Sequence, residues 1–156
     1  MSAAAIVHPK LAQASFERAI RPLLTGADKY ERLGITLIDF SYPHLDVELR
    51  WHAMQASVRL RIEAVDFPYR PVSGWWIDEG GAPLTQGRLR VPTGNGFHPE
   101  ANGKCWFCFK GWREYHDHPS HQDVSWASLR DEPRYSVLQL ISQLHTDMNS
   151  QGVQKS

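Results

Sequence analysis

The sequence predicts an α+β fold in which helices pack against an antiparallel sheet. Three features lead to this expectation: helical periodicity near both ends, regular apolar–polar alternation between them, and a long stretch rich in glycine and proline before the last helix. Alternation with a period of two buries one face of a strand and leaves the other in water, as is typical of antiparallel sheets. Consecutive strands followed by a helix indicate an α+β plan.

The segment PKLAQASFERAIRPLLTGA predicts an N-terminal helix. Pro9 suits the first turn, where no backbone donor is needed, and Gly26 suits the end of the helix. Pro22 lacks a backbone N–H and is expected to bend the helix or end it early. The face turned toward the core is expected to hold Phe16, Ile20, Leu23 and Leu24.

Strands are expected in the middle of the chain. LGITLIDF is a short apolar run, and HLDVELRW and SVRLRIEAV alternate between apolar and polar residues. FPYRPVSGWWID indicates a proline-bounded loop that enters a further strand near residues 75–77. Residues 79–103 are dominated by Gly, Pro, Thr and Asn, so we expect an irregular segment with at most a short strand at RLRV. The core side of the two alternating strands is expected to hold Leu45, Val47, Leu49, Trp51, Val58, Leu60, Ile62 and Ala64.

A second helix is expected in DEPRYSVLQLISQLHTDMN, with Asp131 as its cap and Pro133 in its first turn. The length of 156 residues predicts a single domain spanning residues 1–156, with 149–156 as a flexible tail. The apolar face of this helix is expected to hold Val137, Leu138, Ile141, Leu144 and Met148.

Composition excludes some classes of partner. Seventeen basic and seventeen acidic residues cancel, so no net field draws nucleic acid or an anionic membrane. No apolar run approaches the length of a membrane span, and MSAAAIVHPK does not resemble an export signal, so a cytoplasmic protein is expected. Cys105 and Cys108 are too close in sequence for a useful structural disulfide, so two reduced thiols are expected.

The stretch CWFCFKGWREYHDHPSHQDVSW, residues 105–126, gathers two cysteines, one glutamate and three histidines. One interpretation is a metal site. In an extended EYHDH segment, Glu114, His116 and His118 lie on one side, and Pro119 discourages the helical alternative. With Cys108 they supply the four ligands that zinc prefers.

The other interpretations of this stretch need no metal. Cys108 is a candidate nucleophile, because nearby cations and imidazoles favour a thiolate and an imidazole can accept a proton. Cys108 could equally be a small buried hydrophobe between two phenylalanines. His121 and His145 are expected to be solvated and to orient loops. Core or interface positions are expected for Trp106, Trp112 and Trp126.

Several short motifs resemble the ubiquitin-conjugating (UBC) fold over residues 10–148. VDFPYRPVSGWWID is similar to the proline-rich strand entry of that family, and WASLRDEPRYSVLQLISQL to the segment after its catalytic loop. GFHPEANGKCWFC resembles the His-Pro-Asn motif and its catalytic cysteine, with the usual ten-residue step running from His98 to Cys108. The resemblance implies that His98 braces the loop and that Cys108 carries a thioester. Glu100 replaces the asparagine of the motif, and a carboxylate there would repel an oxyanion.

The run from Cys108 through GWREYHDH resembles a narrower bacterial family, predicted to bind metal and named for a Cys-Glu-His-His set. The matching positions are Cys108, Glu114, His116 and His118. That family is found beside ubiquitin-like proteins, activating enzymes and JAB-type peptidases, which are the partners that the resemblance implies. Zinc is the metal to be considered, although thioester transfer needs no cofactor.

Together these features lead us to expect a cytoplasmic bacterial carrier of a ubiquitin-like protein. Cys108 would accept the modifier from an activating enzyme and pass it to an amine, His116 or His118 would act as base, and Glu114 would orient an imidazole. Two alternatives remain open at this point: a zinc-binding partner module that does not transfer the modifier, and an adaptor that only docks it.

Overall fold

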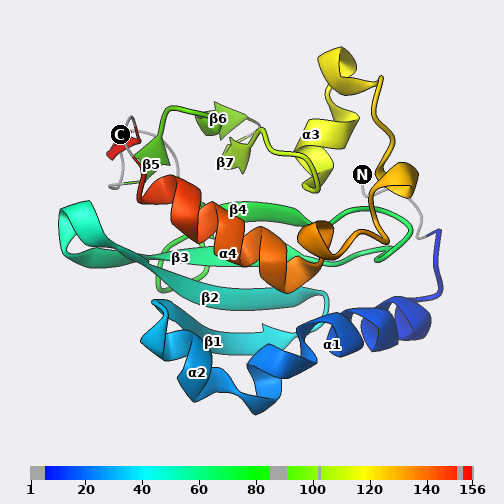
Figure 1. The fold of residues 1–156 in the computed structure, drawn as a ribbon, viewed down its shortest axis with the longest axis horizontal. Coiled ribbons are helices and arrows are strands. Elements are labelled where there is room, and N and C mark those ends of the chain that lie inside the picture. Colours follow the sequence, from blue (N-terminus) through cyan, green and yellow to red (C-terminus); the bar gives the residue numbers. More distant parts are fainter. Residues whose placement is uncertain (1–5, 85–90, 102, 151–152, 156) are drawn as a thin grey trace.

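The computed structural model describes residues 6–84, 91–101, 103–150 and 153–155. An antiparallel sheet with strand order β1-β2-β3-β4 forms the centre of an α+β arrangement, and α4 crosses one face of it (Figure 1). The first half of the chain contains α1 (Pro9–Thr25), α2 (Ala27–Arg32), β1 (Ile35–Ser41), β2 (His44–Trp51), the 3-10 turn His52–Met54, β3 (Ala56–Glu63) and β4 (Ser73–Ile77). The second half contains β5 (Pro92–Thr93), β6 (Phe97–Ala101), β7 (Lys104–Phe107), α3 (Arg113–Asp117), the 3-10 turns Pro119–His121, Trp126–Ser128 and Pro133–Tyr135, α4 (Val137–Met148) and β8 (Gln154–Lys155).

The predicted N-terminal helix is confirmed as α1, but two details differ. The helix continues through Pro22 to Thr25. Pro22 lies on the exposed side, so the carbonyl that loses its helical donor can meet water while Leu23 stays buried. Leu24 is 37% exposed and therefore does not belong to the core face.

The meander follows the predicted alternation. Residues 44–51 of β2 pair with residues 56–63 of β3 along their full length. Leu45, Val47 and Leu49 are fully buried, and the core that they share includes Phe16 of α1 and Ile141 of α4. On the opposite face, charged side chains pair across the strands: Arg61 with Asp46, and Arg59 with Glu48.

The segment expected to be irregular contains β6, which is the first strand of a β-hairpin. β6 pairs with β7, and Phe97 lies opposite Phe107. Both rings pack against Trp76 of β4, so burial of aromatic surface stabilises the hairpin. The sequence around it is rich in turn-forming residues and therefore did not predict strands. The predicted short strand RLRV lies mostly outside the described residues.

Described residues near the end of the chain contact the rest of the fold. Asn149 accepts the His52 N–H at 2.8 Å and donates to the Arg50 carbonyl at 3.0 Å, and β8 pairs with β5. His145, expected in water, is half-buried and donates to the same Arg50 carbonyl, and burial lowers its pKa. Ser136, rather than the expected Asp131, is the N-cap residue of α4, because Pro133 lies in a separate 3-10 turn.

Gly74 marks the closest approach between the sheet and the segment that carries the site. A Cβ at this buried position would lie 2.5 Å from the Trp112 ring. Gly74→Ala is therefore expected to overpack the core and to lower the free energy of unfolding by about 1–3 kcal/mol. Gly80→Ala, at an exposed position where the added Cβ has only an ordinary contact, is the control. Equal urea denaturation midpoints for the two variants would contradict this prediction.

Within the described residues, no helix is long and apolar enough to cross a membrane.

Candidate functional site

The two cysteines have different environments. Cys105 lies in β7, is 1% exposed, and its thiol is 3.1 Å from the Leu84 carbonyl oxygen. Cys108 follows the end of β7, where its N–H donates to the Gly96 carbonyl at 2.8 Å, and its side chain is half-exposed. Because side chains alternate along β7, Cys105 and Phe107 both point inward, and Cys108 follows the end of the strand. Cys108 is therefore the thiol that a partner can reach.

His121 is the imidazole nearest to this thiol. Its Nε2 atom lies 3.5 Å from Cys108 Sγ, within hydrogen-bonding distance for sulfur. The ring stacks on Tyr115, with centroids 3.9 Å apart and planes 12° from parallel. We expected a solvated histidine here, but the 3-10 turn Pro119–His121 folds the ring back over α3 and beside the cysteine.

His116 holds the loop and does not face the thiol. Its Nε2 accepts the Gly111 N–H at 3.0 Å, and its Nδ1 lies 3.3 Å from the Val124 carbonyl oxygen, to which it donates. Burial lowers the pKa of His116 and favours this neutral form. The nitrogen that could act as a base is therefore engaged with the backbone.

His118 lies beyond the end of α3 and is exposed. Its Nδ1 accepts the Ser120 N–H at 3.2 Å and lies 2.7 Å from the Ser120 hydroxyl oxygen. Its ring is nearly parallel to that of Trp106, with centroids 6.1 Å apart. His118 is thus directed toward Trp106 of β7.

Residues 113–117 form the helix α3, so the expected extended conformation of EYHDH is wrong. Arg113 anchors the start of this helix: its backbone N–H donates to Val72, and its guanidinium donates to the carbonyls of Val65 and Pro71. These tertiary contacts favour the helix over the extended conformation that the local sequence would also allow. The helix α3 ends just before His118.

The helix turns Glu114 toward β4. One carboxyl oxygen of Glu114 accepts the Ser73 hydroxyl, and the other is buried with no hydrogen-bond partner in the described part of the chain. Burial raises the pKa of Glu114 above the usual range for a carboxyl. Glu114 therefore does not orient an imidazole, as we had expected, but lies half-buried against Ser73 of β4.

The four residues considered as zinc ligands contact four different groups. Cys108 contacts His121, Glu114 contacts Ser73, His116 contacts Gly111, and His118 contacts Ser120. Across the described ranges, no three His, Cys, Asp or Glu side chains are grouped as metal ligands. This arrangement does not fit a four-ligand zinc site.

Removal of metal is therefore expected to leave the fold intact. Dialysis against EDTA should not change the melting temperature, because the four candidate ligands contact four separate groups in the described part of the chain. Elemental analysis should find well under one equivalent of zinc. Stoichiometric zinc whose loss lowers the melting temperature would overturn this expectation, because structural zinc sites contribute directly to folding.

The half-buried Cys108 thiol opens onto a pocket of about 360 Å³. The pocket is lined by Cys108, by the aromatic side chains of Phe109, Trp112 and Tyr115, and by residues of α4 that include Leu140 and Leu144. Burial raises the pKa of the Cys108 thiol, so the thiol is mostly neutral near pH 7 and can donate its proton to His121. The raised pKa lowers the thiolate fraction, so attack by Cys108 requires a base, and His121 is in position to remove the proton.

No known family model matches the chain, and no curated protein matches its sequence significantly. The chemistry of the site follows from its own geometry. The side chain of Glu100 lies outside the described residues.

The pKa of Glu114 leads to a stability prediction. A carboxyl whose pKa is raised on folding binds its proton more tightly in the native state, so stability falls as pH rises from the unfolded pKa through the folded one. Glu114→Gln removes this loss and keeps a partner for Ser73. The melting temperature of this variant is expected to exceed that of the wild type by a few degrees at pH 7, since about 1 kcal/mol shifts Tm by ~2–4 °C for a protein of this size. The two melting temperatures should converge near pH 4. A variant that melts lower than wild type at pH 7 would contradict the assignment.

Proposed function

We propose that the chain is a cytoplasmic bacterial carrier of a ubiquitin-like protein, with a UBC-like fold and a thioester at Cys108. The observation that carries the proposal is the half-exposed Cys108 with its sulfur 3.5 Å from Nε2 of His121. The contrast with the buried Cys105 supports Cys108 as the acceptor.

The reaction needs one base and no cofactor. His121 Nε2 takes the proton of Cys108 as the sulfur attacks the carbonyl carbon of the modifier's thioester on the activating enzyme. The C–S bond to the activating enzyme breaks, and its cysteine leaves and takes up a proton. In the second step an amine attacks the Cys108 thioester, loses a proton, and releases Cys108 as a thiol.

The order of elements supports a UBC-like fold. An N-terminal helix, a four-stranded meander, a hairpin that carries His98 and leads to Cys108, and a closing helix follow one another as in the conjugating enzymes. His121 takes the role of base that was expected of His116 or His118. An activating enzyme that loads the modifier and a JAB-type peptidase that removes it are the partners of this proposal.

The test is intact-mass spectrometry of the protein mixed with a bacterial ubiquitin-like protein, its cognate activating enzyme and ATP. We expect an adduct of the mass of the modifier less one water, which dithiothreitol removes. The control is a conjugating enzyme that the same mixture charges. Charging of the control without charging of this chain would overturn the proposal, and if the chain then still bound the uncharged modifier, a docking role would be favoured.

A further inference from the structure

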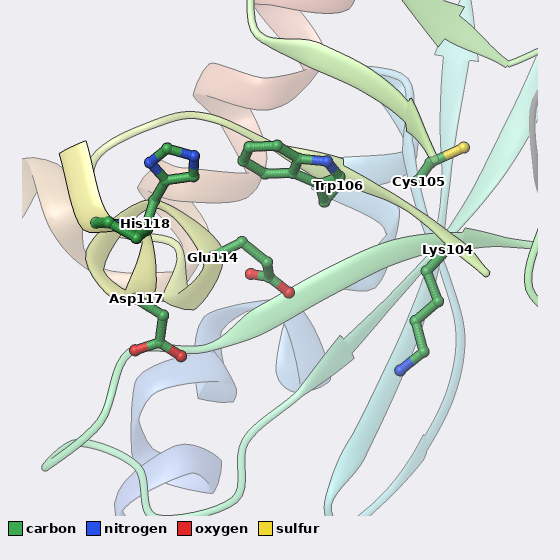
Figure 2. A pocket seen from close by; sticks show the side chains of 7 residues that line it. Lys104, Cys105, Trp106, Glu114, Asp117 and His118 are labelled. Carbon is green, nitrogen blue, oxygen red and sulfur yellow. The ribbon is translucent and has the colours of Figure 1, made fainter. Parts of the chain in front are cut away.

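A second hollow lies between β7 and α3, apart from the pocket of Cys108. Its volume is about 490 Å³, within the range of small-molecule sites. Figure 2 shows Trp106, His118, Glu114 and Asp117 around this hollow, whereas the side chain of Cys105 points away from them. The proposed acyl transfer uses none of these side chains.

Glu114 gives the hollow an unsatisfied acidic group. One of its carboxyl oxygens is buried without a partner among the described residues, although the carboxyl lines the hollow. A buried polar atom without a hydrogen bond destabilises the protein. A donor supplied by a ligand would remove this cost, and a positively charged donor would do so most effectively.

Aromatic rings form one wall of the hollow. Trp106 stacks on His98 with centroids 4.2 Å apart, and the His118 ring lies at 6.1 Å from it, both within 13° of parallel. Indole faces attract cations, and Lys104 already places its ammonium 3.8 Å from the centre of the Trp75 ring.

The charges around the hollow favour a cation over an anion. Glu114 and Asp117 both line it, and 61% of the Asp117 side chain is exposed. The ammonium of Lys104 is directed to Trp75. The guanidinium of Arg70 lies 3.5 Å from the carboxylate of Asp117, so Asp117 already forms an ion pair with a guanidinium at the edge of the hollow.

We propose that this hollow binds an organic cation through a planar guanidinium or an ammonium group. The cation donates to the free oxygen of Glu114, pairs with Asp117 and lies against the indole of Trp106. Two carboxyls and an indole face together select positive charge, and the planar fork of a guanidinium can both stack and donate two hydrogen bonds.

The experiment uses ¹⁵N-labelled full-length protein at pH 7.5 and constant ionic strength. Methylguanidinium chloride is titrated against its neutral isostere methylurea, and n-butylammonium chloride separates guanidinium from ammonium recognition. We expect a saturable shift of the Trp106 indole N–H with one or both cations and none with methylurea. Calorimetry of the same pairs gives the affinities.

Four variants decide the outcome. Glu114→Gln should weaken binding of the preferred cation at least tenfold, and Trp106→Leu should weaken it as well, with folding verified by the amide spectrum. Glu31→Gln, on the distant helix α2, and Cys108→Ser should bind as the wild type does. Three results would each overturn the proposal. Methylurea could bind as tightly as the cations, or Glu114→Gln could bind as tightly as the wild type. The third is the lack of a saturable shift at cation concentrations up to 50-fold above a dissociation constant of ~1 mM.

Discussion

Cys108→Ser is expected to abolish the thiol-labile adduct with the ubiquitin-like protein. A serine oxygen forms an ester, which withstands dithiothreitol and is cleaved by hydroxide, so any remaining adduct should change its chemistry. Cys108→Ala should form no adduct. The measurement is intact mass before and after dithiothreitol and, separately, after mild alkali.

The matched control is Cys105→Ser. Cys105 is 1% exposed, and its thiol lies against the Leu84 carbonyl oxygen, a contact that a serine hydroxyl can keep. Charging of this variant should equal that of the wild type once the melting temperature shows that it is folded. A dithiothreitol-labile adduct that persists in Cys108→Ser and disappears in Cys105→Ser would move the nucleophile to Cys105.

The sheet could be predicted because its signal is local. In β2 every second residue is apolar, and Leu45, Val47 and Leu49 are all fully buried. The β6–β7 hairpin lacked this signal. Phe97 and Phe107 are stabilised by contact with Trp76, which is distant in sequence, and the surrounding glycines and prolines indicate loops.

Part of the geometry around the candidate site follows from the sequence. The ten-residue step from His98 selected Cys108 over Cys105, and the structure places Cys108 as the more exposed thiol. Which histidine lies beside Cys108 depends on whether EYHDH is extended or helical. The contacts of Arg113 with residues 65–72 favour the helix. A local pattern cannot reveal contacts between segments more than 40 residues apart.

One feature of the sequence could have predicted the position of His121 beside Cys108. Pro119 suits the first position of a 3-10 turn and ends the extended or helical path after His118. Such a turn brings the residue two positions later back toward the preceding helix. Stacking of His121 on Tyr115 fixes the result and brings its Nε2 to Cys108.

His121→Gln is expected to slow charging of Cys108 at pH 7 by about 10²-fold, because general bases contribute roughly 10²–10⁴ in rate. Gln keeps much of the size and polarity of histidine but cannot accept the thiol proton. His118→Gln is the control: its ring is directed to Trp106, so charging should be unchanged. Single-turnover transfer from the charged activating enzyme, followed by intact mass, measures both rates.

The pH dependence separates a base from a structural residue. Burial raises the pKa of Cys108, so the wild type has little thiolate at pH 7 and depends on His121 to remove the proton. As pH rises toward this raised pKa, the thiolate forms without help and attacks directly. The deficit of His121→Gln should therefore shrink steadily from pH 7 to pH 9.5, and alkylation of Cys108 by iodoacetamide should rise over the same range in both proteins. A deficit that stays constant with pH would show that His121 only positions the loop.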